Sequence, residues 1–293
     1  MRDDIKRQKC KEHGITLIEV PEIGRRLKVK DVVPFLLSEF DKHNIAYPES
    51  AKSFQIDMKE FYAEYMNEKS TTGVDDLLSE LDAMDFSGNN GVVIGDPING
   101  KAFLAVSNDK GDSWTPIETI DKMMDGEAFF ASSGSNIKLL GLKRGRKTLF
   151  VSGGIQSRFF YNGKAINLPF QSGRNSTGAN GLALNPNQQQ GIIIGGDFAN
   201  DRRSDSAILL FSLNPKVTFS QPVTPPSGYK SAAVFLSKTY VLSCGTSGVD
   251  LSVDGGLNWK NISDIGFHVA VKSPDGKYAI MAGGNGRIAK VLF

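Results

Sequence analysis

The chain has 293 residues, which is enough for one large domain or two ordinary ones with a sizeable core. Its formal net charge of +2 gives no electrostatic argument for a nucleic-acid or membrane partner, and we expect neither. The first residues, MRDDIKRQKCKEHG, lack the apolar run of a signal peptide, so we expect a cytoplasmic protein. Cys10 and Cys244 lie far apart without metal-type neighbours, which predicts neither a disulfide nor a metal site.

The first 70 residues differ in composition from the rest, since they hold only two of the 31 glycines. Asp3 predicts the start of a short basic helix that ends at Gly14, and the run from Ile15 to Val20 reads as a strand. Apolar residues spaced by three and four predict helices over 31–43 and 50–66. We therefore expect an α/β appendage over residues 1–70 and a second domain over 71–293.

One pattern repeats from Leu77 onward: an apolar strand, a polar turn, a second strand ending in Gly, a loop and a third strand. The five predicted units have their strands at 81–86, 91–95 and 102–106; 129–140, 148–154 and 158–161; 181–184, 191–196 and 207–212; 231–236, 240–245 and 250–253; 268–272, 277–283 and 287–293. No helical pattern interrupts the series, which excludes a parallel α/β sheet. The predicted fold class is therefore mainly β, a β-propeller of about five units, and the count leaves open whether the ring is complete.

The pattern S-x-D-x-G-x-x-W occurs twice and uses both tryptophans of the chain. Its members are Ser107, Asp109, Gly111 and Trp114 in the first unit, and Ser252, Asp254, Gly256 and Trp259 in the fourth. An Asp in a turn can accept hydrogen bonds from the backbone N–H groups just beyond it, and Gly supplies a positive φ. The Trp is then placed to fold back over the hairpin as an apolar wedge.

These two motifs resemble the Asp-box (BNR) repeat of sialidase-type β-propellers. Longer stretches, among them GDPINGKAFLAVSNDKGDSW and CGTSGVDLSVDGGLNW, are similar to bacterial BNR/YVTN-type (WD40-like) propellers that are often catalogued as oxidoreductases. That family is related to photosystem II assembly-factor-like proteins, and its members are commonly exported. In such propellers the Asp boxes lie on outer hairpins away from the central site, which implies a structural role for all eight motif residues.

A second resemblance covers the segment RDDIKRQKCKEHGITLIEVPE, residues 2–22. It is similar to the closing helix–strand unit of nucleases of the very-short-patch-repair type. In that family the metal-binding Asp and the catalytic carboxylate and Lys lie upstream, and nothing upstream of this segment is present in the sequence. We therefore expect a nuclease-like fragment that neither cuts nor tightly binds DNA.

In a propeller, the loops between the second and third strands of each unit gather at one mouth of the central channel. This geometry gives a candidate binding mouth made of Asp96, Asn99, Arg158, Asp197, Arg203, Asp205 and Arg287. Such loops are polar for solvation in any propeller, so polarity alone does not distinguish a site from a solvated surface. If the protein has a site, the mouth is where we expect it.

Two enzymatic alternatives were weighed against a binding role. A sialidase needs three arginines, a Tyr–Glu pair and an acidic Asp, and no spacing ties Glu127, Tyr161 and the available arginines into that set. The Gly283–Gly286 run precedes a strand rather than a helix, so it offers no dinucleotide site. We expect no cofactor and no metal, and favour a non-catalytic binding or scaffold module for a protein or glycan partner, with a glycan hydrolase or an oxidoreductase as the alternative.

Ring closure decides the oligomeric state. The last strand of a propeller usually pairs into the blade that holds the first strand, so residues 287–293 are expected to meet residues 81–86. If blades are missing, the open arc leaves apolar sheet edges that invite self-association. The helices at 31–43 and 50–66 could cover one such edge.

Overall fold

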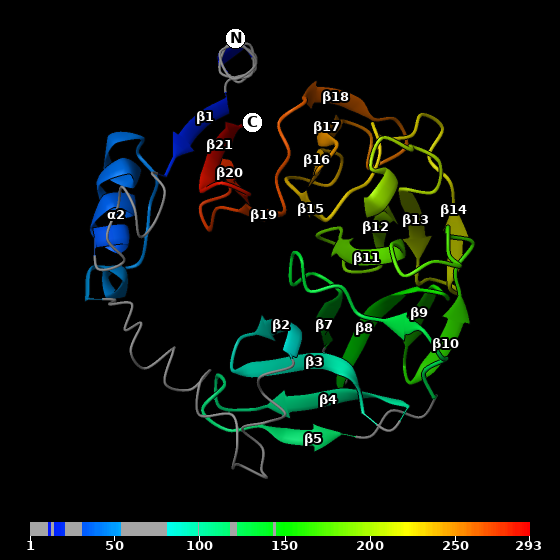
Figure 1. Ribbon diagram of the computed structural model, residues 1–293. Coiled ribbons are helices and arrows are strands. Elements are labelled where there is room, and N and C mark those ends of the chain that lie inside the picture. Colours follow the sequence, from blue (N-terminus) through cyan, green and yellow to red (C-terminus); the bar gives the residue numbers. More distant parts are fainter. Residues whose placement is uncertain are drawn as a thin grey trace.

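The computed structural model describes residues 11–12, 15–20, 31–53, 81–98, 100–117, 122–142 and 145–293. In this part of the chain, five antiparallel blades follow one another around a central axis, and the second and third are joined into one nine-stranded sheet (Figure 1). Each blade begins with its innermost strand and runs outward. This arrangement confirms the predicted β-propeller fold.

The blades are numbered in chain order and their strands are given from the inside outward. Blade 1 consists of β2 (Leu81–Ser87), β3 (Asn90–Ile98), β4 (Lys101–Ser107) and β5 (Thr115–Ile117). Blade 2 consists of β7 (Ile137–Leu142), β8 (Gly145–Gly154), β9 (Arg158–Tyr161) and β10 (Lys164–Asn167), and blade 3 of β11 (Thr177–Leu184), β12 (Gln190–Asp197), β13 (Ile208–Ser212) and β14 (Thr218–Ser220). Blade 4 consists of β15 (Ala232–Phe235), β16 (Val241–Gly245), β17 (Gly248–Ser252) and β18 (Lys260–Ser263). Blade 5 is β19 (Val269–Lys272), β20 (Tyr278–Gly283), β21 (Arg287–Leu292) and β1 (Ile15–Glu19). The short β6 (Glu127–Ala128) pairs with the end of β8.

The last blade is completed by a strand from the beginning of the chain. β1 pairs antiparallel with β21, with Ile15 opposite Val291 and Glu19 opposite Arg287. Leu17 packs into the core shared with blade 4, whereas Ile18 points to the opposite face of the sheet. A strand with apolar residues on both faces suits this buried outer position.

Two expectations are corrected by this pairing. The prediction that residues 287–293 meet residues 81–86 is wrong, because both edges of β21 are occupied by β20 and β1. No strand pair among the described residues joins blade 5 to blade 1. The expected appendage is also not separate, since residues 15–19 of the 1–70 segment belong to the last blade.

Helix α2 (Val32–Lys42) lies against blade 5 on its outward face (Figure 1). Phe40 and Ile45 pack on Ile18 and Ile280 there. The Lys290 ammonium donates to the carbonyl oxygens of His43 and Asn44, each at 2.8 Å, so a buried cation satisfies carbonyls at the C-terminal end of the helix. The predicted strand 15–20 and helix 31–43 are thus confirmed, while most of the helices expected over 3–13 and 50–66 lies outside the described residues.

Blade-to-blade packing forms the core. Aliphatic side chains of each blade interdigitate with those of its neighbours, and the middle strands β12 and β16, with residues 149–154 of β8, are almost entirely buried. The strand expected over 129–140 instead starts at Ile137, because a Ser-rich turn with Gly134 at φ 61° precedes it. The glycines that close the middle strands have a steric reason: a Cβ at Gly195 or Gly245 would collide with the carbonyl oxygen of Gly178 or Tyr229.

Candidate binding mouth

The predicted mouth residues fall into distinct environments. Asp96 is exposed at the end of β3, and Asn99 lies outside the described residues. Arg203 and Asp205 are exposed and pair with each other through two hydrogen bonds of 2.6 Å. The Arg203 hydrogen bond keeps the pKa of Asp205 below its usual value. Arg287 is half-buried and donates from Nε to the carbonyl oxygen of Gly284 at 2.9 Å.

Two of the predicted residues are buried and shape the mouth from below. Asp197 is 1% exposed and accepts a hydrogen bond from the N–H of Ala199 at 3.0 Å, which caps the short helix η3 (Phe198–Asn200). Arg158 is 7% exposed and forms an ion pair with Glu127. Neither side chain is presented to a ligand. Both instead fix the loops that carry their neighbours.

The Glu127–Arg158 pair ties the loop before blade 2 to β9. Arg158 donates from Nε and Nη2 to the two carboxylate oxygens at 2.8 and 2.5 Å, and Nη2 also reaches the carbonyl oxygen of Lys122 at 2.8 Å. Glu127 further accepts from the Ser152 hydroxyl and from the N–H of Met124. Because every charge is matched inside the sheet, removal of one partner would leave an uncompensated buried ion.

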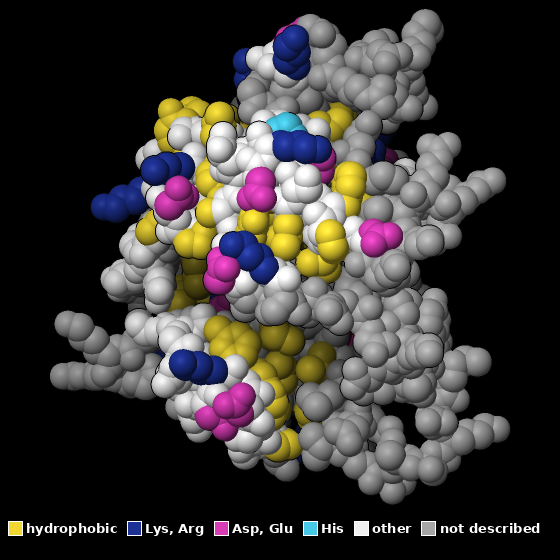
Figure 2. Space-filling view, turned by 90° about the vertical axis from the view of Figure 1, so that its left-hand side faces the viewer, with side chains coloured by type: hydrophobic (Ala, Val, Ile, Leu, Met, Phe, Trp, Pro, Cys, Tyr) yellow, Lys and Arg dark blue, Asp and Glu magenta, His cyan; other side chains and the backbone are white. Residues whose placement is uncertain are grey.

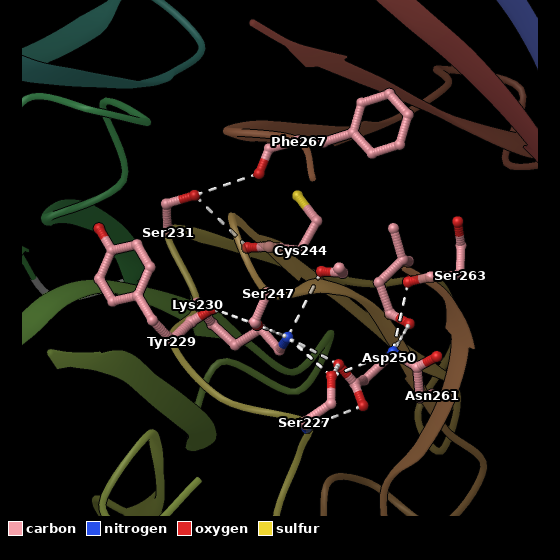
Figure 3. Close-up of polar contacts among 12 residues, drawn as sticks. Ser227, Tyr229, Lys230, Ser231, Cys244, Ser247, Asp250, Asn261, Ser263 and Phe267 are labelled. Carbon is pink, nitrogen blue, oxygen red and sulfur yellow. Dashed lines mark hydrogen bonds and ion pairs between the residues drawn. The ribbon is translucent and has the colours of Figure 1, made fainter. Parts of the chain in front are cut away.

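A second buried ion pair holds the loop before blade 4 (Figure 3). Lys230 is fully buried, and its Nζ lies 2.7 Å from Oδ2 of Asp250 and 2.7 Å from Oγ of Ser247. Asp250 also accepts from the N–H and hydroxyl of Ser227 at 3.0 and 2.7 Å. Burial lowers the pKa of Lys230, and Asp250 opposes that shift. Burial also raises the pKa of the neighbouring Cys244 thiol to about 12, so the thiol stays protonated.

Three large apolar side chains are exposed at the end of blades 2 and 3 where Gly178 of β11 lies opposite both Gly153 of β8 and Gly196 of β12. Met124, Ile155 and Phe198 are 53%, 43% and 48% exposed, although each comes from a different loop of blades 2 and 3. The N–H of Ile155 donates to the carbonyl oxygen of Gly126 at 2.9 Å, which joins the loops that carry Met124 and Ile155. We call Met124, Ile155 and Phe198 the mouth patch.

Aromatic contacts connect the mouth patch to the interior. The Phe198 ring lies edge-on to Phe130 and Tyr229, with ring centroids 5.9 and 6.2 Å away. Tyr229 is buried, and burial raises its pKa while a hydrogen bond with Ser132 opposes the shift. Phe198 is therefore supported from below and keeps its outer surface accessible.

The Asp-box turns lie at the other end of the strands, between the third and fourth strands of blades 1 and 4. In blade 1, Ser107 Oγ accepts from the N–H of Gly111 at 2.8 Å, and Asp109 Oδ1 accepts from the N–H of Ser113 at 3.0 Å. In blade 4 the same bonds join Gly256 to Ser252 at 2.9 Å and Asn258 to Asp254 at 2.9 Å.

Hydrogen bonds from these turn donors lower the pKa of both carboxyl groups. The largest contributions are the side-chain hydrogen bonds of Ser113 to Asp109 and of Asn258 to Asp254. Both carboxylates therefore accept hydrogen bonds from donors within their own turns.

A cleft of about 530 Å³ opens beside the second Asp box, between blades 3 and 4. Phe211, Phe219 and Leu257 line its apolar part, and Lys238 stands at its rim. Asp254 also lines the cleft, but its oxygens accept from Ser252 and Asn258.

The sequence did not predict the mouth patch, the Lys230–Asp250 pair or the cleft. One signal was present for the patch: Ile155 and Phe198 are large apolar residues one or two positions after a strand-ending Gly, in loops expected to be polar. Among the described residues, no group of three or more His, Cys, Asp or Glu side chains could hold a metal ion. No described helix combines the length and apolarity needed to span a membrane.

Comparison with known proteins gives similarities of fold only. No protein-family model matches the sequence, and no curated protein does. Among solved structures, YCF48 bound to D1 peptide is similar at 15% identity and a TM-score of 0.36, over 72% of this chain and 78% of that one. The Dos1 propeller is similar at 11% sequence identity and a TM-score of 0.43, over 72% of this chain and 68% of that one. The GH74 enzyme of Niastella koreensis is similar at 12% sequence identity and a TM-score of 0.41, over 72% of this chain but only 45% of the enzyme's own length.

Proposed function

We propose that this protein is a non-catalytic binding module that holds an extended segment of a partner protein at the mouth of its propeller. The observation that carries the proposal is the mouth patch. Three large apolar side chains from separate loops at the same end of blades 2 and 3 are each about half exposed, and the Glu127–Arg158 pair fixes the loop that carries Met124. Apolar side chains gathered on a rigid, polar-rimmed surface mark interaction sites.

The composition of the patch favours a peptide over a glycan. Met124 and Ile155 offer aliphatic and thioether surface without hydrogen-bonding groups, and Met adapts its shape to varied apolar partners. The surrounding loops carry charges of both signs, including the exposed Lys122, Arg202 and Asp125. We therefore propose a segment anchored by large apolar side chains, without a strong charge preference.

The finer family assignment is part of the proposal. The paired hydrogen-bond patterns of the two turns support placement of the chain among Asp-box propellers, with a structural role for the Asp-box residues. The incorporation of Ile15–Glu19 into blade 5 supports a structural rather than a nuclease role for that segment. A cytoplasmic location and the exclusion of nucleic acid stay predictions.

The enzymatic alternatives find little support in the geometry. Glu127 and Arg158, which a sialidase-like reaction could use, neutralise each other in a buried pair. Tyr161 stands at the opposite end of β9 from Arg158, three residues away and therefore roughly 10 Å along the strand. Proton transfer or nucleophilic attack would need these groups free and convergent on one substrate.

Selection from a random peptide display library tests the proposal. We expect the protein to enrich peptides with large apolar side chains, and expect Ile155→Ser/Phe198→Ser to lose them. Val253→Ser is the matched control, because Val253 is 56% exposed at the Asp-box end. Melting temperatures establish that both variants fold. Binding to a glycan array in place of peptides, or turnover of a generic glycoside by the intact protein, would overturn the proposal.

A further inference from the structure

Blades 1 and 4 can be superposed residue by residue through their Asp boxes. The Asp-box Ser107 lies opposite Gly91, which lies opposite Phe86. In blade 4, Ser252 lies opposite Val241, which in turn lies opposite Phe235. Two residues earlier in each inner strand, on the same face, Met84 corresponds to Ala233. Phe86, Met84 and Trp114 therefore occupy the positions of Phe235, Ala233 and Trp259.

In blade 4 this face is an interface between blades. Phe235 and Trp259 are 7% and 5% exposed, because they pack on Ile192, Ile194 and neighbouring side chains of blade 3. A Cβ built on Gly256 of the Asp box would lie 3.1 Å from Ile192, so even the turn touches the preceding blade. The face is thus built to receive the aliphatic side of another sheet.

In blade 1 the same face is at the end of the arc. Met84 and Phe86 are 53% and 41% exposed, and Trp114 is half-buried. Phe86 and Trp114 pack edge-on against each other with ring centroids 5.9 Å apart. The atoms nearest to a Cβ built on Gly111 belong to these two rings of the same blade. Figure 2, which views the open side of the arc, shows hydrophobic side chains at the surface of its lower half.

The other end of the arc is covered. The outward face of blade 5 packs against α2 through Phe40 and Ile45, and Lys290 is bonded to the end of the helix segment. A head-to-tail contact between copies would have to displace this helix. Repeat proteins commonly protect their end repeats in this way. Of the two ends, blade 1 is the one that presents large exposed aromatic surface without a comparable cover of described residues.

We propose that a second copy of this chain docks on the outward face of blade 1, so that two arcs meet end to end about a two-fold axis. Met84, Phe86 and Trp114 of the two copies would form the centre of the contact. The Asp-box turn beside them carries the exposed Lys110 and Asp112, so the surface is self-complementary in charge. Since blade 1 is the uncovered end among the described residues, the association closes at the dimer instead of growing into a filament.

Light scattering coupled to size-exclusion chromatography of the full chain, over a concentration series, tests this inference. We expect a species of twice the chain mass that dissociates on dilution, with a red shift of Trp114 emission as the contact opens. Met84→Lys places two like charges in the contact and should weaken the dimer roughly tenfold or more. Val253→Lys, at an equally exposed position of blade 4, should leave the dimer intact.

A monomer at every concentration would overturn the inference. So would a dimer that Met84→Lys leaves unchanged, because the contact would then lie elsewhere. Phe86→Ser provides a second, uncharged variant of the same face, and its melting temperature separates loss of the contact from loss of the fold. Neither result depends on the mouth patch, which lies at the other end of the strands.

Discussion

The two Asp boxes have the same sequence pattern and the same hydrogen bonds, yet their tryptophans have different surroundings. Trp259 fills the interface between blades 3 and 4, while Trp114 packs on Phe86 of its own blade and stays partly exposed. The turn is therefore a local structure that forms from its own residues. The burial of its Trp depends on whether another blade lies beside it, so the motif alone does not specify a blade interface.

The largest expected effect is a difference in the free energy of unfolding between variants of the two tryptophans. Trp259→Ala should lower the free energy of unfolding by about 3–5 kcal/mol, because it opens a cavity between two blades. Trp114→Ala should lower it by only about 1–2 kcal/mol, since the side chain is already partly exposed to solvent and no second blade packs on it among the described residues. Urea denaturation under conditions that keep the protein monomeric measures both. Equal losses would contradict the difference in packing.

The covered end of the arc gives the next prediction. Lys290→Met keeps most of the side-chain volume and removes the hydrogen bonds to the carbonyls of His43 and Asn44. We expect a loss of about 1–3 kcal/mol in the free energy with which α2 is held on blade 5. Hydrogen exchange of the α2 amides measures this loss directly. Faster exchange throughout blades 2 and 3 in the variant would show that the effect is not local to the cap.

Because the two Asp boxes share the same hydrogen bonds, removing their serines should lower the free energy of unfolding by similar amounts, smaller than the loss for Trp259→Ala. Ser107→Ala and Ser252→Ala each remove a buried hydroxyl that accepts from a Gly N–H and donates to the Asp carboxylate. Each should cost about 1–2 kcal/mol. A large difference between the two serines, measured in the same urea experiment, would mean that the turns depend on their neighbours after all.

The smallest expected effect is a pH dependence shared by both turns. The folded protein lowers the pKa of Asp109 and Asp254, so their contribution to stability is present above the unfolded value of about 4 and is lost as pH falls toward the folded values. Replacing both residues with Asn should flatten the dependence of the urea midpoint on pH below about 4. If the urea midpoint of the double variant fell with pH as steeply as that of the original protein, Asp109 and Asp254 would not be the cause of the pH dependence.

The sequence predicted the parts of the fold that depend on nearby residues. The strand pattern, the strand-closing glycines and the helix over 31–43 follow from local spacing, and the structure has them. The partner of β1 could not be predicted, because any open sheet edge could have accepted an apolar strand with both faces buried. The separation of 270 positions between Ile18 and its opposite residue Ile288 illustrates the difficulty.

The loops that carry the candidate mouth could be located from the sequence, but the surroundings of their side chains could not. The loops between the second and third strands could be located from the strand count. Whether Arg158 reaches solvent depends on Glu127, 31 residues earlier, and no spacing rule joins the two. Phe198 was overlooked because its exposure follows from the Asp197 cap and the rings beneath it, which come from separate blades.

Acrylamide quenching of the two single-tryptophan variants most directly tests the claim that, among the described residues, blade 5 is a covered end of the propeller and blade 1 an uncovered one. The chain has only two tryptophans, so Trp114→Phe reports on Trp259 and Trp259→Phe reports on Trp114. At concentrations where the protein is monomeric, we predict that Trp114 is quenched several-fold more efficiently and emits further to the red than Trp259. Equal quenching and coincident emission maxima would show that blade 1 is covered as fully as blade 4, and would contradict the account.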